Sequence, residues 1–131
     1  MQNYFDNEVS SRDNLILAIC DKESDKHVGN VSIMGIDSFN QSGEFAIILG
    51  DRNFWGKGIG QEAARLIIDH AFKQLNLKRI YCGTLDTNKG MQKLADKLGF
   101  TKEGQSRQSQ FKNGKFHDTL EYGILKDEWN N

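Results

Sequence analysis

Hydrophobic and polar positions follow two different periods along this chain, and the change of period divides it into a strand-rich first part and a helical middle. An apolar run bounded by charged residues occupies 14–20, as is typical of a strand covered on both faces. β-Branched residues recur over 27–36 and 42–49, and a polar reversal over 37–41 separates these two segments. We therefore expect three successive strands that form a meander.

Over 59–74 the apolar positions instead recur every three or four residues, which predicts a helix with one buried stripe that includes Leu66 and His70. A short β-branched and aromatic segment over 78–85 indicates another strand. A second helix is expected over 88–98. Its ends are marked by Asn88, a residue type that caps helix N-termini, and by Gly99, a residue type that terminates helices.

The last third contains two apolar segments, 108–111 and 116–125, on either side of Asn113-Gly114, which is a strong hairpin signal. The element order is then β-β-β-α-β-α-β-β, which indicates a mixed α+β sheet rather than a doubly wound one. The polar segment 1–13 is expected to be either the end of a helix or a mobile arm, and the pattern does not decide between them.

Composition limits the domain count and the class of partner. With 131 residues and 37% hydrophobic content, the chain can bury one sizeable core, so residues 1–131 are expected to form a single domain. The 17 basic and 18 acidic residues are well mixed and give a net charge of −1. Because no field of one sign results, neither nucleic acid nor a membrane surface is expected as a partner.

The cysteines and histidines predict no metal site. Cys20 and Cys82 have neither the spacing of metal ligands nor the density of a disulfide scaffold, which favours a reducing compartment. The three histidines, His27, His70 and His117, lie on separate expected elements. No leader or membrane span is evident, so we expect a cytoplasmic protein.

A glycine-rich turn, 51–63, lies between the third strand and the first helix. Glycines let the backbone approach an anion, and free N–H groups at a helix start point toward it, so phosphate binding is one interpretation; a tight connection is the other. A P-loop is excluded because Gly58 follows Lys57 where a Ser or Thr is needed. A Rossmann site is disfavoured because three meandering strands precede the turn.

Three blocks together resemble the GNAT superfamily of acyl-CoA-dependent N-acetyltransferases, in particular its Rim-type ribosomal-protein and spermidine N-acetyltransferase branch. The first block aligns Trp55, Gly58 and Gly60 with the family's pyrophosphate loop. The second, Asn88-Lys-Gly-Met-Gln-Lys-Leu-Ala-Asp-Lys-Leu-Gly-Phe100, is similar to the family's second-helix motif. The third comprises 103–104, 111–118 and 123–125. The resemblance extends over residues 14–127 and implies a twisted, mostly antiparallel sheet with flanking helices.

The family resemblance also implies where acetyl-CoA would bind. Strands 42–49 and 78–85 would splay apart, and the pantetheine amides would pair with backbone near Ile47, Ile48 and Leu49. The pyrophosphate would rest on the amides of Gly56, Lys57, Gly58, Ile59, Gly60 and Gln61. Asn88 would contact the cofactor region. Trp55 would either shield the cofactor or serve as a packing anchor.

The chemistry of the family needs a base for the amine and an acid for the released thiolate. The resemblance points to Glu44 as the base; the other interpretation is a solvated edge carboxylate. Ala95 stands where the family commonly has a tyrosine acid, and Tyr81 and Tyr122 are the remaining hydroxyl candidates. We therefore expect acetyl transfer to a primary amine of a polyamine, amino sugar, antibiotic or protein N-terminus. The alternative is a catalytically weak acyl-CoA-binding module.

Family members begin with a strand and two helices before the segment that matches 14–20, whereas about a dozen residues precede it here. The expected fold therefore lacks the usual first strand and helix, and the sheet would have an exposed edge. This leads to the hypothesis of a homodimer in which one protomer helps to close the acceptor site of the other.

Overall fold

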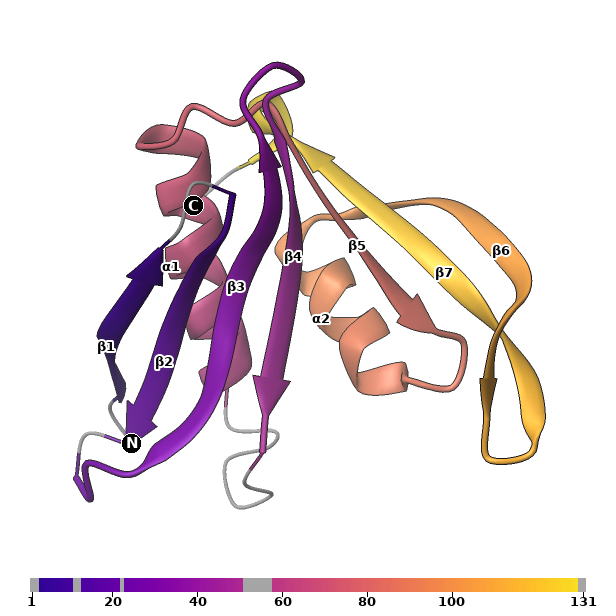
Figure 1. Cartoon of the computed structure of the whole chain (residues 1–131), viewed down its shortest axis with the longest axis horizontal. Helices are drawn as coiled ribbons and strands as arrows, with labels where there is room; N and C mark the ends of the chain where they lie inside the picture. Colours follow the sequence, from indigo (N-terminus) through magenta and orange to yellow (C-terminus); the bar gives the residue numbers. More distant parts are fainter. Residues whose placement is uncertain (1–2, 11–12, 22, 51–57, 130–131) are drawn as a thin grey trace.

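Seven strands form one sheet in the order β1-β2-β3-β4-β5-β7-β6, and both helices lie on the same face of it (Figure 1). The structure is a computed structural model that describes residues 3–10, 13–21, 23–50 and 58–129. The elements are β1 (Asn3–Ser10), β2 (Leu15–Asp21), β3 (His27–Asp37), β4 (Ser42–Leu49), α1 (Ile59–Lys73), β5 (Arg79–Leu85), α2 (Lys89–Leu98), β6 (Thr101–Lys112) and β7 (Lys115–Leu125). The predicted mixed α+β class and the element order from residue 14 onward are confirmed.

The first segment is a strand, and both alternatives considered for residues 1–13 are therefore wrong. β1 pairs antiparallel with β2 from Asn3 opposite Asp21 to Ser10 opposite Leu15, with an irregularity after Asp6. A strand therefore does precede β2, and β1 rather than β2 forms this edge of the sheet. The polar composition concealed it because an edge strand needs backbone partners more than apolar side chains.

Helix α1 presents its apolar face to the sheet, although not quite the face that the periodicity indicated. Leu66 is 48% exposed and His70 is exposed, whereas Phe72 is 1% exposed. The buried face comprises Ile59, Ala63, Ala64, Ile67, Ile68, Ala71 and Phe72. Three alanines in this face allow close approach to the strands, and apolar burial is the main source of stability in such a layer.

Helix α2 begins and ends at the predicted residues. The Asn88 side chain accepts a hydrogen bond from the Met91 N–H at 3.0 Å, and so satisfies one of the free amides at the helix start. Gly99 ends the helix in the left-handed conformation, with a φ of 92°. The predicted hairpin turn is also present, since Asn113 and Gly114 have φ values of 53° and 77°, as a type I′ turn requires.

Strand β6 is much longer than the predicted 108–111, because it begins at Thr101. Its side chains are exposed or half-buried throughout, so neither face supplies an apolar alternation that could have revealed the strand. Register shifts interrupt its pairing with β7 between Lys102 and Gly104 and between Ser106 and Gln110. The β6–β7 hairpin projects from the rest of the molecule (Figure 1).

Strands β4 and β5 separate shortly after they meet, and this separation positions the candidate site. Their parallel pairing comprises three residue pairs, from Ser42 with Arg79 to Glu44 with Tyr81, after which the strands diverge (Figure 1). Beyond Glu44, β4 continues to pair with β3 as far as Leu49 opposite Gly29. The divergence confirms the splayed strands that the family resemblance implied.

Neither helix within residues 58–129 is long and apolar enough to cross a membrane.

Candidate cofactor and acceptor site

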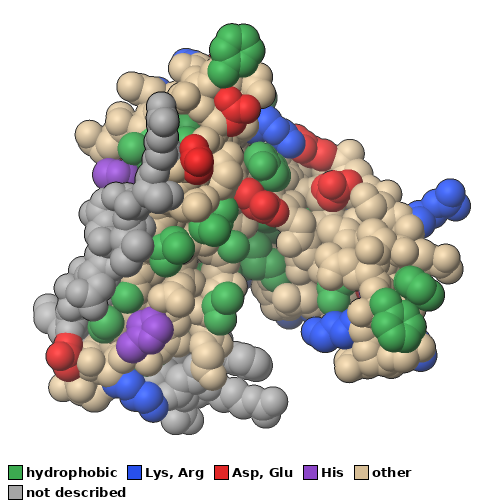
Figure 2. Space-filling view, in the orientation of Figure 1, with side chains coloured by type: hydrophobic (Ala, Val, Ile, Leu, Met, Phe, Trp, Pro, Cys, Tyr) green, Lys and Arg blue, Asp and Glu red, His purple; other side chains and the backbone are tan. Residues whose placement is uncertain are grey.

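A cleft of about 740 Å³ opens between the end of β4, the start of α1 and helix α2. One wall is formed by Ile47, Leu49, Gly58, Gly60 and Gln61, and the other by residues 87–91, 93, 94 and 97. Figure 2 shows the molecule hollowed between the part that carries β1–β4 and the projecting hairpin. The cleft therefore lies where the strands diverge, with a helix N-terminus in each wall.

The start of α1 is arranged to present free backbone amides to the cleft. Gly58, the N-cap, has a left-handed φ of 77°, a conformation that favours glycine. No side chain among the described residues caps this end of the helix, and uncapped amides at a helix start are groups that can bind an anion. A Cβ on Gly60 would lie 3.5 Å from Ile47 Cδ1, which is an ordinary contact distance and shows that the start of α1 packs beside β4.

The opposite wall carries positive charge. Lys89, Lys93 and Lys97 all line the cleft from α2, and their spacing of four residues places them on one side of the helix. The sequence analysis did not single them out, because lysines at this spacing are usual on a solvated helix face. With the helix N-terminus opposite, they make the cleft suited to a polyanionic ligand.

Asn88 both caps helix α2 and lines the cleft, as the sequence suggested. Its side chain caps α2, and the residue also lines the cleft beside Thr87 and Gly90. Its backbone N–H donates to the carbonyl of Leu85 at 3.0 Å, which fixes the turn that leads from β5 into α2. A change at Asn88 can therefore affect helix stability and ligand binding separately.

A second cavity, of about 320 Å³, contains Glu44 and lies near the point where β4 and β5 separate. Successive strand residues point to opposite faces, so Glu44 faces away from the helices, whereas Ile47 and Leu49 face toward them. Tyr81, the register partner of Glu44, lines the same cavity. Figure 2 shows acidic side chains gathered on this face of the sheet.

The walls of the second cavity carry three carboxylates and one paired cation. The Arg79 guanidinium donates to both carboxylate oxygens of Glu103 at 2.7 and 2.6 Å. These hydrogen bonds from Arg79, with its charge, lower the pKa of Glu103. A Cβ on Gly123 would lie 2.5 Å from an atom of each partner, so a side chain there would push the ends of Arg79 and Glu103 aside. Glu44 and Glu121 complete the lining carboxylates, which leaves the cavity net negative.

Two potential acid groups border this cavity, and both stay protonated. Burial raises the pKa of Cys82 to about 12, and the Glu44 carboxylate adds to the shift, so the thiol is not a ready nucleophile. Burial likewise raises the pKa of Tyr122, with Asp96 as a further cause. Ala95 is 1% exposed and brings no ionisable group to the position where the family commonly has tyrosine.

The predicted cofactor residues divide into three groups. Ile47, Leu49, Gly58, Gly60, Gln61 and Asn88 all line the cleft. The side chains of two others point elsewhere, since Ile48 is 68% exposed on the opposite face and Ile59 is buried in the core; only their backbone could serve a ligand in the cleft. Trp55, Gly56 and Lys57 lie outside the described residues.

The described part of the chain brings no three His, Cys, Asp or Glu residues close enough to hold a metal ion.

Comparison with protein families identifies the fold's relatives. A family model described as an acetyltransferase (GNAT) domain matches residues 1–101. The chain is 37% identical over 108 residues to an N-acetyltransferase p20 of Bacillus licheniformis, covering 82% of this chain and 60% of that protein. It is 30% identical over 110 residues to the spermidine N(1)-acetyltransferase of Escherichia coli K12, covering 84% and 57%. The chain thus spans about 60% or less of the length of these relatives.

Solved structures give the same result. A ribosomal-protein-S5-alanine acetyltransferase from Vibrio fischeri superposes with a TM-score of 0.82 at 31% identity, covering 90% of this chain and 64% of that one. The spermidine N-acetyltransferase of Vibrio cholerae, solved with CoA and spermine, gives a TM-score of 0.84 at 27% identity, covering 92% and 70%. Fold, motifs and family model agree, and this chain belongs to the GNAT acetyltransferase family.

Proposed function

We propose that this protein transfers the acetyl group of acetyl-CoA to a primary amine, with the cofactor in the larger cleft and the amine in the cavity at Glu44. The observation that carries the proposal is that the N-terminus of α1 and three lysines of α2 line the same cleft from opposite walls. An anion placed there would meet a helix N-terminus on one side and ammonium groups on the other. The diphosphate and 3′-phosphate of CoA have the required charge.

The pantetheine arm would run from the cleft along Ile47 and Leu49 toward the point where β4 leaves β5. The thioester would then reach Glu44 and Tyr81, the last residues paired between the two strands. This route supports the assignment of cofactor and acceptor to opposite faces of the sheet. It also gives Ile48 a backbone role, in keeping with its outward side chain.

In the proposed reaction Glu44 takes a proton from the bound ammonium, directly or through water, so that the neutral amine can attack. Nitrogen bonds to the thioester carbonyl carbon, the carbon–sulfur bond breaks, and the CoA thiolate leaves with the bonding electrons. The attacking nitrogen loses its second proton as the amide forms, and the thiolate gains one, so a water molecule at the site can carry the proton from nitrogen to sulfur. No metal is needed for any of these steps.

The acceptor is proposed to be a cationic amine. Arg79 is held by Glu103, so Glu44 and Glu121 are left to favour a positive ligand in the second cavity. Polyamines and protein N-termini both meet this condition. Among the relatives, the Escherichia coli protein is named for spermidine and the Vibrio fischeri protein for an alanine of ribosomal protein S5.

Thermal unfolding with acetyl-CoA, followed by thiol release with an amine panel, tests the proposal. Acetyl-CoA at about 100 times its dissociation constant should add roughly 2.7 kcal/mol of stability. Turnover of a polyamine or an N-terminal peptide would support the transferase. Binding without turnover of any amine would favour the acyl-CoA-binding module, the alternative that Ala95 motivates, and absence of binding would contradict both.

The homodimer and the cytoplasmic location remain proposals. Among the described residues β1 and β6 are the outermost strands of the sheet, and edge strands are commonly covered in stable proteins. The buried thiols of Cys20 and Cys82 suit a reducing compartment. A monomeric scattering profile at micromolar concentration would contradict the dimer.

A further inference from the structure

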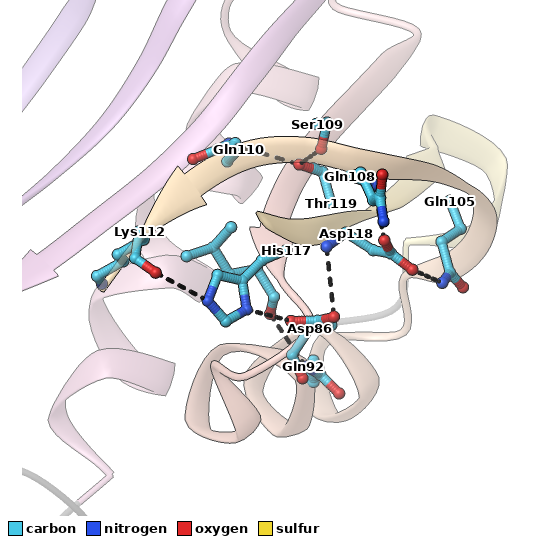
Figure 3. Close-up of polar contacts among 11 residues, drawn as sticks. Asp86, Gln92, Gln105, Gln108, Ser109, Gln110, Lys112, His117, Asp118 and Thr119 are labelled. Carbon is cyan, nitrogen blue, oxygen red and sulfur yellow. Dashed lines mark hydrogen bonds and ion pairs between the residues drawn. The ribbon is translucent and has the colours of Figure 1, made fainter. Parts of the chain in front are cut away.

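A polar cluster centred on Asp86 and His117 joins the turn between β5 and α2 to the β6–β7 hairpin (Figure 3). Asp86 is in the turn from β5 to α2, and His117 is in β7. Nδ1 of His117 lies 3.3 Å from Oδ1 of Asp86, and its Nε2 lies 3.2 Å from the carbonyl oxygen of Lys112. The His117 side chain is only 16% exposed, so water can reach it on a limited surface.

Both partners of His117 are acceptors, and this determines the protonation state in which both contacts are hydrogen bonds. A carboxylate and a carbonyl oxygen accept hydrogen bonds but donate none. A neutral imidazole carries one N–H, whereas the imidazolium carries two. Asp86 and Lys112 can therefore be bonded to His117 at the same time only when its ring is protonated, and loss of that proton leaves one contact without a hydrogen.

The turn that contains Asp86 leads directly into the residues that form one wall of the larger cleft. The backbone N–H of Asp86 donates to the Asp118 carbonyl at 3.0 Å, and the Asp118 N–H donates to Asp86 Oδ2 at 3.3 Å. The Gln92 side chain donates to the carbonyls of Leu85 and Asp86 at 3.2 and 3.0 Å. Residues 87–91, which follow directly, line the cleft and include Asn88, the cap of α2.

We infer that protonated His117 is a positioning residue that holds the Asp86 turn, and with it the α2 wall of the cleft, in the form that binds the cofactor. The inference rests on the proposed function in so far as the cleft binds acetyl-CoA. When the ring loses its second proton, one of the two contacts is no longer a hydrogen bond, so the Asp86 turn is held less firmly at higher pH. The charged groups whose interactions place them around His117 are Asp86 in the β5–α2 turn and Asp118 in β7, and the Asp118 carboxylate interacts with both His117 and Arg107 of β6.

Acetyl-CoA affinity measured calorimetrically at pH 6 and pH 8 tests this in the wild type, His117→Gln and His70→Gln. The phosphate monoester of CoA also titrates near pH 6 and can itself change the affinity with pH. The test is therefore the difference in pH dependence between the variants and the wild type. The dissociation constant of acetyl-CoA should rise from pH 6 to pH 8 in both proteins. The factor of this rise should be about three times larger in the wild type than in His117→Gln, because only the wild type loses a hydrogen bond of His117. His70, exposed on α1, is the matched control and should behave as the wild type does. An equal pH response in all three proteins would overturn the inference.

A cofactor-free measurement separates failure of this inference from failure of the proposed function. In ¹⁵N-labelled protein without ligand, the backbone amides of Asn88 and Met91 should titrate with the His117 ring, and this titration should vanish in His117→Gln. Amides that do not respond to pH would overturn the inference even if acetyl-CoA binds. Amides that titrate in a protein that binds no acetyl-CoA would support the inference for the turn and contradict the proposed function.

Discussion

Gly58 and Gly114 share a left-handed φ of 77°, and a Cβ at either position would meet no described atom within 4 Å. They differ in location, because Gly58 begins α1 at the larger cleft and Gly114 is in the hairpin turn. A substitution at each therefore imposes the same backbone strain and the same added side chain. Only the one at Gly58 places that side chain where the diphosphate is proposed to bind.

Gly58→Glu should abolish the stabilisation by acetyl-CoA, since a carboxylate would occupy the helix N-terminus and repel the diphosphate. Gly114→Glu should keep it. Both variants should lose about 1 kcal/mol of intrinsic stability from the left-handed backbone. Thermal unfolding with and without ligand measures both effects. If the two variants respond equally to acetyl-CoA, the proposed anion site at the start of α1 is wrong.

Glu44→Gln should lower kcat by about 10² to 10⁴ while leaving acetyl-CoA affinity unchanged, because the amide cannot take the proton of the amine. Glu121→Gln is the matched control, since this residue lines the same cavity from β7. It should raise KM for a cationic amine and change kcat little. Steady-state kinetics with a saturating cofactor separates these outcomes. A Glu44→Gln enzyme with normal kcat would refute the base assignment.

The local signals in the sequence were reliable where a single residue decides the conformation. Asn88 and Gly99 bound α2, and Asn113-Gly114 forms the hairpin turn, because capping and positive φ depend on the residue itself. β1 and most of β6 were missed for the opposite reason. Both strands depend on backbone pairing with a neighbour, and the exposed side chains of β6 follow no apolar alternation.

The candidate site was predictable on the side of α1 but not on the side of α2. The glycines that open α1 could be recognised from their spacing and from the family resemblance. Lys89, Lys93 and Lys97 could not, because their spacing is shared by any solvated helix face. Only the tertiary fold shows that α2 stands across the cleft from the start of α1.

Asn88 offers two variants that separate its structural role from its role in the cleft. Asn88→Asp keeps an oxygen that accepts from the Met91 N–H, so the cap and the stability should be retained. The added negative charge should nevertheless weaken acetyl-CoA binding. Asn88→Ala should lose about 1 kcal/mol of stability, because the cap is removed. Urea unfolding and ligand titration of both variants provide the test, and unchanged affinity in Asn88→Asp would place Asn88 outside the cofactor contacts.

The Arg79–Glu103 pair predicts how stability depends on acid pH. The pKa of Glu103 is lowered in the folded protein, so its carboxylate stabilises the fold above its unfolded pKa of about 4.3. This contribution is lost as pH falls through the lower folded pKa. Glu103→Gln should therefore be less stable than the wild type at pH 6 and similar to it near pH 3. Because both side chains are 38% exposed, solvent screening limits the difference to about 0.5 kcal/mol.

Urea unfolding at pH 3, 4 and 6 measures this difference, with Glu23→Gln as the control because Glu23 is an exposed carboxylate in the turn between β2 and β3. The control should stay parallel to the wild type across the range. If the stability difference between Glu103→Gln and the wild type is the same at pH 3 and pH 6, packing and not charge accounts for it.

The same variant also predicts an effect on substrate binding. Since Arg79 and Glu103 both line the second cavity, loss of the pair should also free the guanidinium. The same variant should then raise KM for a cationic amine, because the freed Arg79 repels it.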